Sequence, residues 1–284
     1  MLKKFLTGVF CVIAFLSAVG AEAVFNYPDA VGKTPGSNLR VVSYNILAGK
    51  WGEKYWPVKT RLPKIVGVIH KLQPDFAGLQ EVDGIWYKML ADQIAPWKFA
   101  GNPYDKSMCA IIYDSRKYRR IDGGVYALDT RSNMYIRCLR WTLLENIQTG
   151  AKIIVTNTHW QLNVPKRLNN SALMAGFIKE LETRFPGIPF FCTGDYNSQL
   201  KHKEFDNLLK ATGFKDAVAS ATVTENREFG SVFRPSAKKL VPRRTHIDHI
   251  VVSSGVKVLS AKMVVGNSLF SASDHLPIMA DFEI

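Results

Sequence analysis

Cysteine is scarce in this sequence, and its distribution excludes two common kinds of site. The chain of 284 residues has four cysteines, one of which, Cys11, lies in an apolar N-terminal run. The other three, Cys109, Cys138 and Cys192, are an odd number without a close pair. This spacing excludes a disulfide framework and a zinc site built on Cys-X-X-Cys. We expect three buried thiols that pack as small hydrophobic groups. A single bridge between Cys109 and Cys138 is the alternative if their strands are neighbours.

Other familiar catalytic and structural patterns are also absent. The sequence has no glycine-rich phosphate loop and no serine nucleophile elbow, which argues against nucleoside-triphosphate switching and acyl transfer. It has no internal repeat, low-complexity tract or linker that would divide the chain. Because 47% of the residues are hydrophobic, the chain is long enough to bury one large core. We therefore expect a single domain over residues 24–284.

The apolar run at the N-terminus is shorter than a membrane-spanning helix and resembles an export signal. Lys3 and Lys4 precede an apolar run over residues 5–19, and the small-residue string Ala21-Glu22-Ala23 follows it. This pattern predicts a signal peptide over residues 1–23 and an exported protein, periplasmic or secreted. A membrane anchor is the alternative, but the run is shorter than the roughly 20 residues of a spanning helix. Exported free thiols fit a bacterial periplasm or exterior.

Positive charge predominates along the chain. The sequence has 37 Lys and Arg against 24 Asp and Glu, a formal net charge of +13, and removal of the predicted signal lowers it to +12. A charge of this sign attracts polyanions such as nucleic acid, anionic lipid or phosphorylated metabolites. The basic residues are dispersed apart from two clusters, over residues 116–120 and 234–244.

Apolar periodicity predicts strands interleaved with a few helices. Helical spacing predicts helices over 62–72, 87–94, 166–183 and 204–212, and places Leu173, Phe177 and Leu181 on one face of the third. The segment 146–150 is a turn signal and predicts an antiparallel hairpin. Together the elements predict two sheets packed face to face with helices outside. Strands are expected at 39–46, 76–79, 108–113, 124–128, 137–144, 152–158, 188–192, 247–252, 256–265 and 278–282.

Polar side chains stand at the ends of several of these strands, where they would gather on one rim of a sheet. They occur in short strings: Ser43-Tyr44-Asn45-Ile46, Leu79-Gln80-Glu81-Val82, Asn157-Thr158-His159, Gly194-Asp195-Tyr196-Asn197-Ser198, Ile247-Asp248-His249-Ile250 and Ser273-Asp274-His275. In this order, between Val41 and Phe282, they resemble the endonuclease/exonuclease/phosphatase superfamily, the family of deoxyribonuclease I. The resemblance implies an α+β fold, a four-layer α/β/β/α sandwich of two mixed, mainly antiparallel sheets.

The resemblance also implies a metal-dependent phosphoesterase and a role for each motif residue. Glu81 is expected to be the principal Mg²⁺ ligand, with Asn45 and Asp274 completing or orienting its shell, because a hard cation prefers oxygen donors. Mn²⁺ and Ca²⁺ are the alternative metals. Asp195 would align or deprotonate the attacking water, and Asn197 would hold the phosphate or the metal.

The histidines divide into two groups. His275 would act as acid/base or contact the phosphate, with its tautomer fixed by Asp248, and His159 would bind the phosphate from the other side. His249 is expected to pack between strand residues, whereas for His246, which precedes the strand, a structural and a functional role both stay open.

The substrate is the least determined part of the interpretation. Arg234, Arg243 and Arg244, with Lys238 and Lys239, are expected to hold phosphates distal to the cut. The aromatic residues 51, 55 and 56 would stack on bases, enter a lipid interface or cover the sheet edge. We expect a monomeric, exported phosphodiesterase, with nucleic acid as the first candidate substrate. One alternative is a phosphatase or phospholipase-type enzyme acting on phosphoinositide, sphingomyelin or a small phosphate ester, and another is an inactive basic binding protein.

Overall fold

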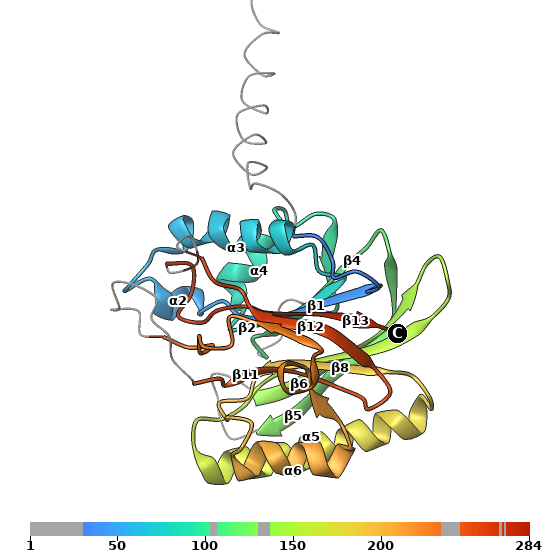
Figure 1. The fold of residues 1–284 in the computed structure, drawn as a ribbon. Coiled ribbons are helices and arrows are strands. Elements are labelled where there is room, and N and C mark those ends of the chain that lie inside the picture. Colours follow the sequence, from blue (N-terminus) through green and yellow to red (C-terminus); the bar gives the residue numbers. More distant parts are fainter. Residues whose placement is uncertain (1–30, 103–106, 130–136, 234–244, 267–268, 270) are drawn as a thin grey trace, which may run out of the picture.

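Two sheets pack face to face in this protein, and helices cover both outer faces (Figure 1). The computed structural model describes residues 31–102, 107–129, 137–233, 245–266, 269 and 271–284. The order of layers confirms the α/β/β/α sandwich expected from the resemblance. No helix of these residues combines the length and apolar character that a membrane span requires.

The first sheet has seven strands in the order β10-β12-β13-β1-β2-β4-β3. Its neighbours pair antiparallel except for β1 with β2 and β10 with β12. The strands are β1 (Leu39–Asn45), β2 (Phe76–Gln80), β3 (Trp97–Phe99), β4 (Cys109–Asp114), β10 (Val223–Glu225), β12 (Lys257–Met263) and β13 (Ile278–Glu283).

The second sheet has six strands in the order β5-β6-β7-β8-β11-β9. Only β7 and β8 pair in parallel, so both sheets are mixed and mainly antiparallel. The turn between β6 and β7 closes the predicted hairpin, with Glu145 opposite Lys152. The strands are β5 (Tyr118–Asp129), β6 (Arg137–Asn146), β7 (Lys152–His159), β8 (Phe190–Asp195), β9 (Lys215–Asp216) and β11 (Asp248–Val252).

Each outer layer is built from helices with one buried face. α3 (Val58–Leu72) and α4 (Gly84–Leu90) lie over the first sheet, and α5 (Val164–Arg184) and α6 (Lys203–Thr212) lie under the second (Figure 1). Two shorter helices, α2 (Gly49–Gly52) and α7 (Ala217–Ser220), follow β1 and β9. Local signals fix the ends of the helices. Asn163 accepts a hydrogen bond from the backbone at the start of α5, and left-handed Gly213 follows α6.

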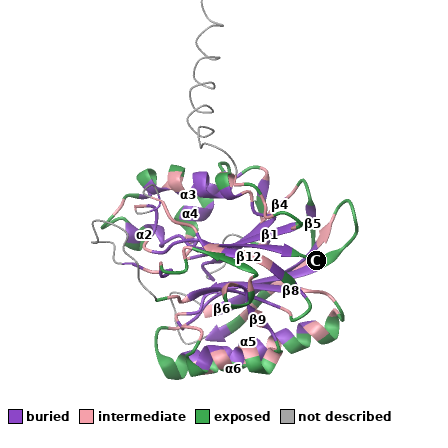
Figure 2. Ribbon diagram, viewed as in Figure 1, coloured by how far each residue is buried: buried purple, intermediate pink, exposed green. Residues whose placement is uncertain are grey.

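The hydrophobic core divides into two clusters, one around the first sheet and one between the second sheet and α5 and α6 (Figure 2). Phe191 of β8 bridges the sheets, with its ring 5.4 Å from Phe76 and 5.2 Å from Phe282. The backbones approach closely where Gly78 faces Thr193, since a Cβ on Gly78 would lie 1.8 Å from the threonine hydroxyl. The sheets are therefore held in one tight relative position.

Some sequence predictions need correction. The second helix spans Gly84–Leu90 instead of 87–94, because Asp83 caps it early through the backbone N–H of Trp86. The deepest face of α5 carries Met174, Ile178 and Leu181, whereas the predicted Leu173 and Phe177 are only partly buried. β5 is also much longer than the predicted strand at 124–128.

The prediction of three buried, free thiols is confirmed. Cys109, Cys138 and Cys192 are all free and buried. Cys109 of β4 and Cys138 of β6 belong to different sheets, so the two strands are not paired neighbours. A hydrogen bond between these two thiols, together with burial, holds the pKa of Cys109 well above its ordinary value, which keeps it protonated and unreactive.

Candidate active site

Strand pairing brings four of the predicted residues to one edge of the sandwich. Asn45 lies opposite Gln80 in the parallel pair of β1 and β2, directly before Glu81. His159 lies opposite Asp195 in the parallel pair of β7 and β8. Parallel strands deliver their ends to the same side. The two sheets meet there, because Asn45 Nδ2 donates to Asp195 Oδ2 at 3.1 Å.

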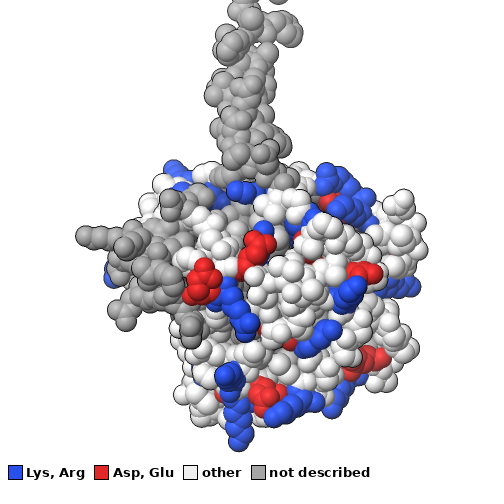
Figure 3. Space-filling model, viewed as in Figure 1, with Lys and Arg blue, Asp and Glu red and all other residues white. Residues whose placement is uncertain are grey.

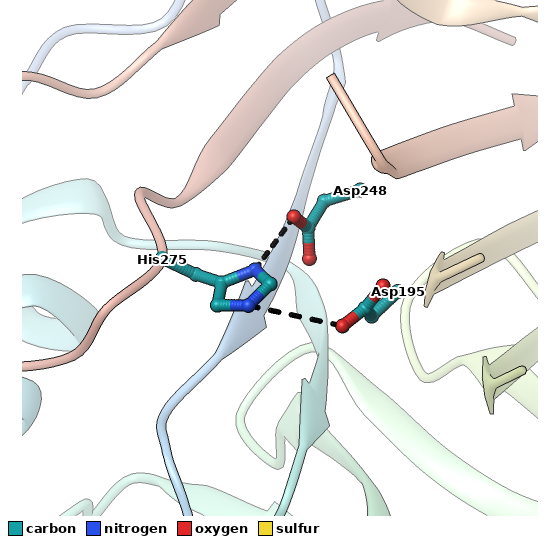
Figure 4. A group of neighbouring side chains, drawn as sticks. All are labelled: Asp195, Asp248 and His275. Carbon is teal, nitrogen blue, oxygen red and sulfur yellow. Dashed lines mark hydrogen bonds and ion pairs between the residues drawn. The ribbon is translucent and has the colours of Figure 1, made fainter. Parts of the chain in front are cut away.

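Asp248 and His275 complete the group from a different direction. Asp248 begins β11, which runs antiparallel to β8, and it lies opposite Asp195. His275 precedes β13, and its Nδ1 lies 2.8 Å from Asp248 Oδ2 (Figure 4). Its Nε2 lies 3.9 Å from Asp195 Oδ2. All three residues are buried, and each offers a ligand atom within 4.8 Å of the others.

Glu81 is held beside this group by its own backbone conformation and by two donors. Its Oε1 accepts from Asn45 Nδ2 at 3.1 Å, and its Oε2 accepts from the backbone N–H of Ala48 at 2.8 Å. Glu81, Leu47 and Asn197 all have positive φ, of 63°, 56° and 49°. Residues other than glycine rarely adopt this conformation, and such strain concentrates at functional sites.

The electrostatics of the two central histidines differ. Burial, together with the nearby Arg137 and His275, holds the pKa of His159 well below its ordinary value, so this imidazole is neutral. Its Nε2 lies 3.3 Å from Asp195 Oδ2. Burial also acts to lower the pKa of His275, but the charge and hydrogen bond of Asp248 raise it well above the ordinary value. One imidazole is therefore neutral and the other is a cation.

Asp195 has the properties of a base that works near neutral pH. Burial and the charge of Asp248 raise its pKa to about 7, and these effects outweigh the opposing influence of His275. Its Oδ1 accepts from the backbone N–H of Asn197 at 2.9 Å, which fixes the orientation of the carboxylate. A general base is most effective when its pKa is close to the working pH.

The donor set beside Asp195 fits a hard divalent cation. Burial and the nearby Glu81 carboxylate raise the pKa of Asp274, although His275 opposes the shift. A cation between the two carboxylates would relieve their repulsion, and carboxylate and amide oxygens are the ligands that Mg²⁺ and Ca²⁺ prefer. Oδ1 of Asp248 is also buried without a hydrogen-bond partner among the described residues. Glu81, Asp274 and Asn45 offer oxygen donors of the kind that such a cation binds, and their assignment as its ligands stays a prediction.

Several further residues support the site, and among them Ser231 alone lies outside the motif strings. The hydroxyl of Ser231 accepts from the backbone N–H of Asp248 at 3.1 Å, and the hydroxyl of Ser273 donates to the carbonyl of Asn45 at 2.7 Å. Gln80 donates to Asn157 Oδ1 at 2.7 Å across the two sheets. Serine occurs in many surface turns, so only its contacts distinguish Ser231 from other serines.

His249, His246 and Asn197 differ in the contacts that their side chains make. His249 is structural, as predicted: its Nδ1 lies 2.8 Å from Asp216 Oδ2, and its ring stacks on Phe205. The imidazole Nε2 of His246 lies 3.1 Å from the carbonyl oxygen of Arg227. Asn197 Nδ2 donates to the carbonyl of Trp160 at 2.9 Å, which uses one of the two N–H groups of its amide.

The predicted substrate-contacting residues are only partly described. Trp51 and Tyr55 are 45% and 51% exposed, whereas Trp56 packs against the core. Two of the three aromatic residues therefore do not cover the sheet edge. Lys238, Lys239 and the predicted phosphate contacts Arg234, Arg243 and Arg244 lie outside the described residues, as does the predicted signal peptide over 1–23.

The fold and this rim of carboxylates, amides and histidines define a phosphoesterase scaffold, and the chain belongs to the Endonuclease/Exonuclease/phosphatase family. The family model matches residues 42–275, from β1 through His275. The chain is 25% identical over 219 residues to Protein angel of Drosophila melanogaster, an alignment that covers 67% of this chain and 62% of that protein. The chain thus spans less than two thirds of that relative's length.

Solved structures show the same fold at low sequence identity. A mannosyl-6-phosphatase of Bacteroides thetaiotaomicron superposes with a TM-score of 0.75 and 21% identity, over 86% of this chain and 99% of that one. The D. rerio TDP2 in complex with a single-strand DNA product superposes with a TM-score of 0.69 and 16% identity, over 87% and 99% of the two chains. These similarities establish the architecture, and the substrate has to be argued separately.

Proposed function

We propose that this protein is an exported, Mg²⁺-dependent phosphodiesterase that acts as a monomer, with nucleic acid as the first candidate substrate. The observation that carries the proposal is the continuous set of buried contacts from His275 through Asp248 and Asp195 to Asn45 and Glu81. Burial of ionisable groups together is unfavourable because of desolvation, and groups whose pKa values are perturbed in this way cluster at functional sites.

The proposed reaction is in-line attack of water on phosphorus. Asp195 orients this water and accepts its proton, for which a pKa of about 7 is suitable. The neutral His159 donates a hydrogen bond to a phosphoryl oxygen. The cationic His275, oriented by Asp248, stabilises the charge that develops on the phosphoryl group. The amide of Asn197 contacts the attacking water through its oxygen or the phosphate through its second N–H.

When bound by Glu81, Asp274 and Asn45, a divalent cation would supply Lewis-acid stabilisation of the phosphoryl and leaving oxygens. The residues themselves are held in place for this task before any ligand arrives. Glu81 accepts from Asn45 and from Ala48, and the loop carrying Asp274 is tied to Phe233 by a 2.9 Å backbone hydrogen bond. Side chains that are already in position do not need to reorganise during the reaction, so the free-energy cost of that reorganisation is avoided.

Charge and exposed aromatic residues favour nucleic acid. The chain carries a net charge of +13, and its basic side chains are spread over the face seen in Figure 3 with acidic ones among them. Exposed Trp51 and Tyr55 lie in and just after α2, the helix that follows the Asn45 strand, where they are suited to stack on unpaired bases. The structural likeness to TDP2 bound to a single-strand DNA product is consistent with such a substrate.

A phosphatase or phospholipase-type enzyme that acts on a compact ester is the second candidate. Its support is the likeness to the Bacteroides mannosyl-6-phosphatase, whose fold superposes over 86% of this chain. An inactive basic binding protein is the third candidate, and the intact set of polar side chains argues against it.

A substrate panel separates these candidates. The purified mature protein is incubated with Mg²⁺ and single-stranded DNA, duplex DNA, RNA, a phosphoinositide, sphingomyelin, a hexose phosphate or p-nitrophenyl esters. Cleavage of polymers that falls steeply with added salt is the expected result, because phosphate contacts release counterions. Hydrolysis confined to the lipid or the small esters would overturn the nucleic-acid assignment. Absence of all hydrolysis would overturn the enzyme assignment.

A further inference from the structure

A cavity of about 680 Å³ lies directly beside the proposed catalytic residues. Its lining comes from the segment 199–202 before α6, from β9 and α7, from residues 227–228, and from the start of β11. Asp248 belongs to both sites, because it lines the cavity and also binds His275. The cavity therefore begins one side chain away from the reacting centre.

The residues at the back of the cavity are held in place by hydrogen bonds and ring stacking. His249 lies between Asp216 Oδ2, at 2.8 Å from Nδ1, and the carbonyl of Ser198, at 2.9 Å from Nε2. Its ring stacks on Phe205 with centroids 4.1 Å apart. Asp216 also caps α7, since its Oδ1 accepts from the backbone N–H of Ala219 at 2.8 Å. This wall is fixed before any ligand binds, as in most small-molecule sites.

The mouth of the cavity has more positive than negative side chains. Lys201 and Arg227 are both exposed, and neither forms an ion pair or a side-chain hydrogen bond with another described residue. The imidazoles of His202 and His246 lie on the same lining, and Glu228 is the one exposed acid among the lining residues. These groups favour an anion, since a phosphate oxygen would give the free guanidinium and ammonium groups partners.

The segment that presents Arg227 is held in a defined position. Nε2 of His246 lies 3.1 Å from the carbonyl of Arg227. The preceding Asn226 has a φ of 56°, and its Nδ2 donates to the carbonyl of Met263 at 3.0 Å. The backbone N–H of Phe229 then donates to the carbonyl of Asn226 at 3.0 Å. Arg227 therefore projects from an anchored turn.

We propose that this cavity is a subsite for a second phosphate group of the substrate, carried on the sugar or similar unit next to the phosphorus that is attacked. The inference rests on the proposed phosphoesterase function. Leu200 and Val218 give the cavity an apolar surface for the ring, and Lys201 and Arg227 supply charge for the phosphate. A volume of about 680 Å³ suits one sugar phosphate unit and is too small for a duplex.

The test compares substrates that differ by one phosphate. Two pairs are used: a thymidine dinucleotide with and without an added terminal phosphate at either end, and a hexose monophosphate with the corresponding bisphosphate. For each, kcat/KM is measured with the wild type, with the double variant Lys201→Gln, Arg227→Gln, and with the control Lys210→Gln. Lys210 is a suitable control because it is 74% exposed on α6 and pairs with Asp206.

The added phosphate is expected to raise kcat/KM of the wild type and the control by about 10-fold or more, as charge-assisted contacts allow. In the double variant the ratio is expected to fall to near one. A gain with the dinucleotide identifies the source as nucleic acid, and a gain with the hexose bisphosphate identifies it as a small metabolite. Hydrolysis without a gain in either pair, or a gain that survives in the double variant, would overturn the subsite.

A binding measurement separates this inference from the proposed function. Thymidine bisphosphate and thymidine monophosphate are titrated calorimetrically into the wild type and into the double variant. Tighter binding of the bisphosphate to the wild type alone would support the subsite even if the protein hydrolysed nothing. Equal affinity for the two nucleotides would contradict it even if the protein proved to be an active phosphodiesterase.

Discussion

Replacement of Asp248 by asparagine tests the proposed relation between Asp248 and His275. The two side chains are 2.8 Å apart and are both buried, so solvent water cannot stabilise the imidazolium in place of the lost carboxylate. The asparagine keeps the size of the side chain but removes the charge that raises the pKa of His275. The imidazole should then lose both its positive charge and its fixed tautomer.

The size of the effect follows from the burial of the pair. Removal of one partner from a buried ion pair costs about 3–5 kcal/mol. Since about 1.4 kcal/mol corresponds to a factor of ten in rate, kcat/KM should fall roughly 10²- to 10⁴-fold if most of this energy acts in the transition state. A similar energy lost from the folded state would instead appear in the unfolding transition.

The assay measures kcat/KM for hydrolysis of bis(p-nitrophenyl) phosphate with Mg²⁺, together with urea unfolding of each variant. Asp206→Asn is the matched control, because Asp206 lies on the surface of α6 and its side chain pairs with exposed Lys210. The control should retain wild-type kcat/KM. If folded Asp248→Asn remains within about threefold of the wild type, the proposed role of Asp248 is refuted.

Two further predictions concern stability. Gly78→Ala should destabilise the fold by about 1–3 kcal/mol, because its Cβ would meet the Thr193 hydroxyl at 1.8 Å, whereas Gly176→Ala in open space on α5 should stabilise it by about 0.5–1 kcal/mol. Urea unfolding measures both, and a neutral Gly78→Ala would contradict the tight sheet contact. Asp216→Asn should destabilise the fold by about 3 kcal/mol at low pH, because it removes the buried partner of His249. Burial acts to lower the pKa of His249, but Asp216 raises it above the ordinary value against that effect, with Asp248 adding to the rise. Stabilisation from a raised pKa is complete below the unfolded value of about 6.5 and declines as pH rises through the folded value, so the deficit of the variant should shrink as the pH rises above about 6.5. A deficit that is constant with pH would contradict this assignment.

Local sequence patterns were sufficient for most individual elements. The strand-like apolar runs of β6 and β7 and the turn between them predicted a hairpin, and the structure pairs Glu145 with Lys152 beside that turn. Helix α6 was also predicted within one residue, because Gly213 ends it in the left-handed conformation. Such features depend on residues that are close in the sequence and can therefore be predicted from it.

Long-range contacts were not predictable in the same way. The parallel pairing of β1 with β2 and of β7 with β8 decides which strand ends meet, and no local pattern encodes it. The buried Arg40 is an example among side chains. It donates to Asp281 from Nε at 2.6 Å and from Nη2 at 2.8 Å, yet the sequence shows only one more basic residue in a basic chain.

The candidate site was predicted in its members but not in its organisation. The family motifs identified Asn45, Glu81, Asp195, Asp248 and His275, which the structure brings together. The motifs did not reveal that one amide, Asn45, links the carboxylates of the two sheets. They also gave no indication of the cavity beside Asp248, because its lining comes from segments that match no motif.

The most direct test of the account is metal-dependent hydrolysis at this rim. Hydrolysis of p-nitrophenyl phosphodiesters is measured during a Mg²⁺ titration of EDTA-treated protein, for the wild type, for Glu81→Gln and for the exposed α5 control Glu180→Gln. The account predicts hydrolysis that depends on Mg²⁺ in the wild type and the control and falls at least about 100-fold in Glu81→Gln. Full activity of Glu81→Gln, or hydrolysis indifferent to Mg²⁺, would contradict the assignment of this rim as a metal-dependent phosphoesterase centre.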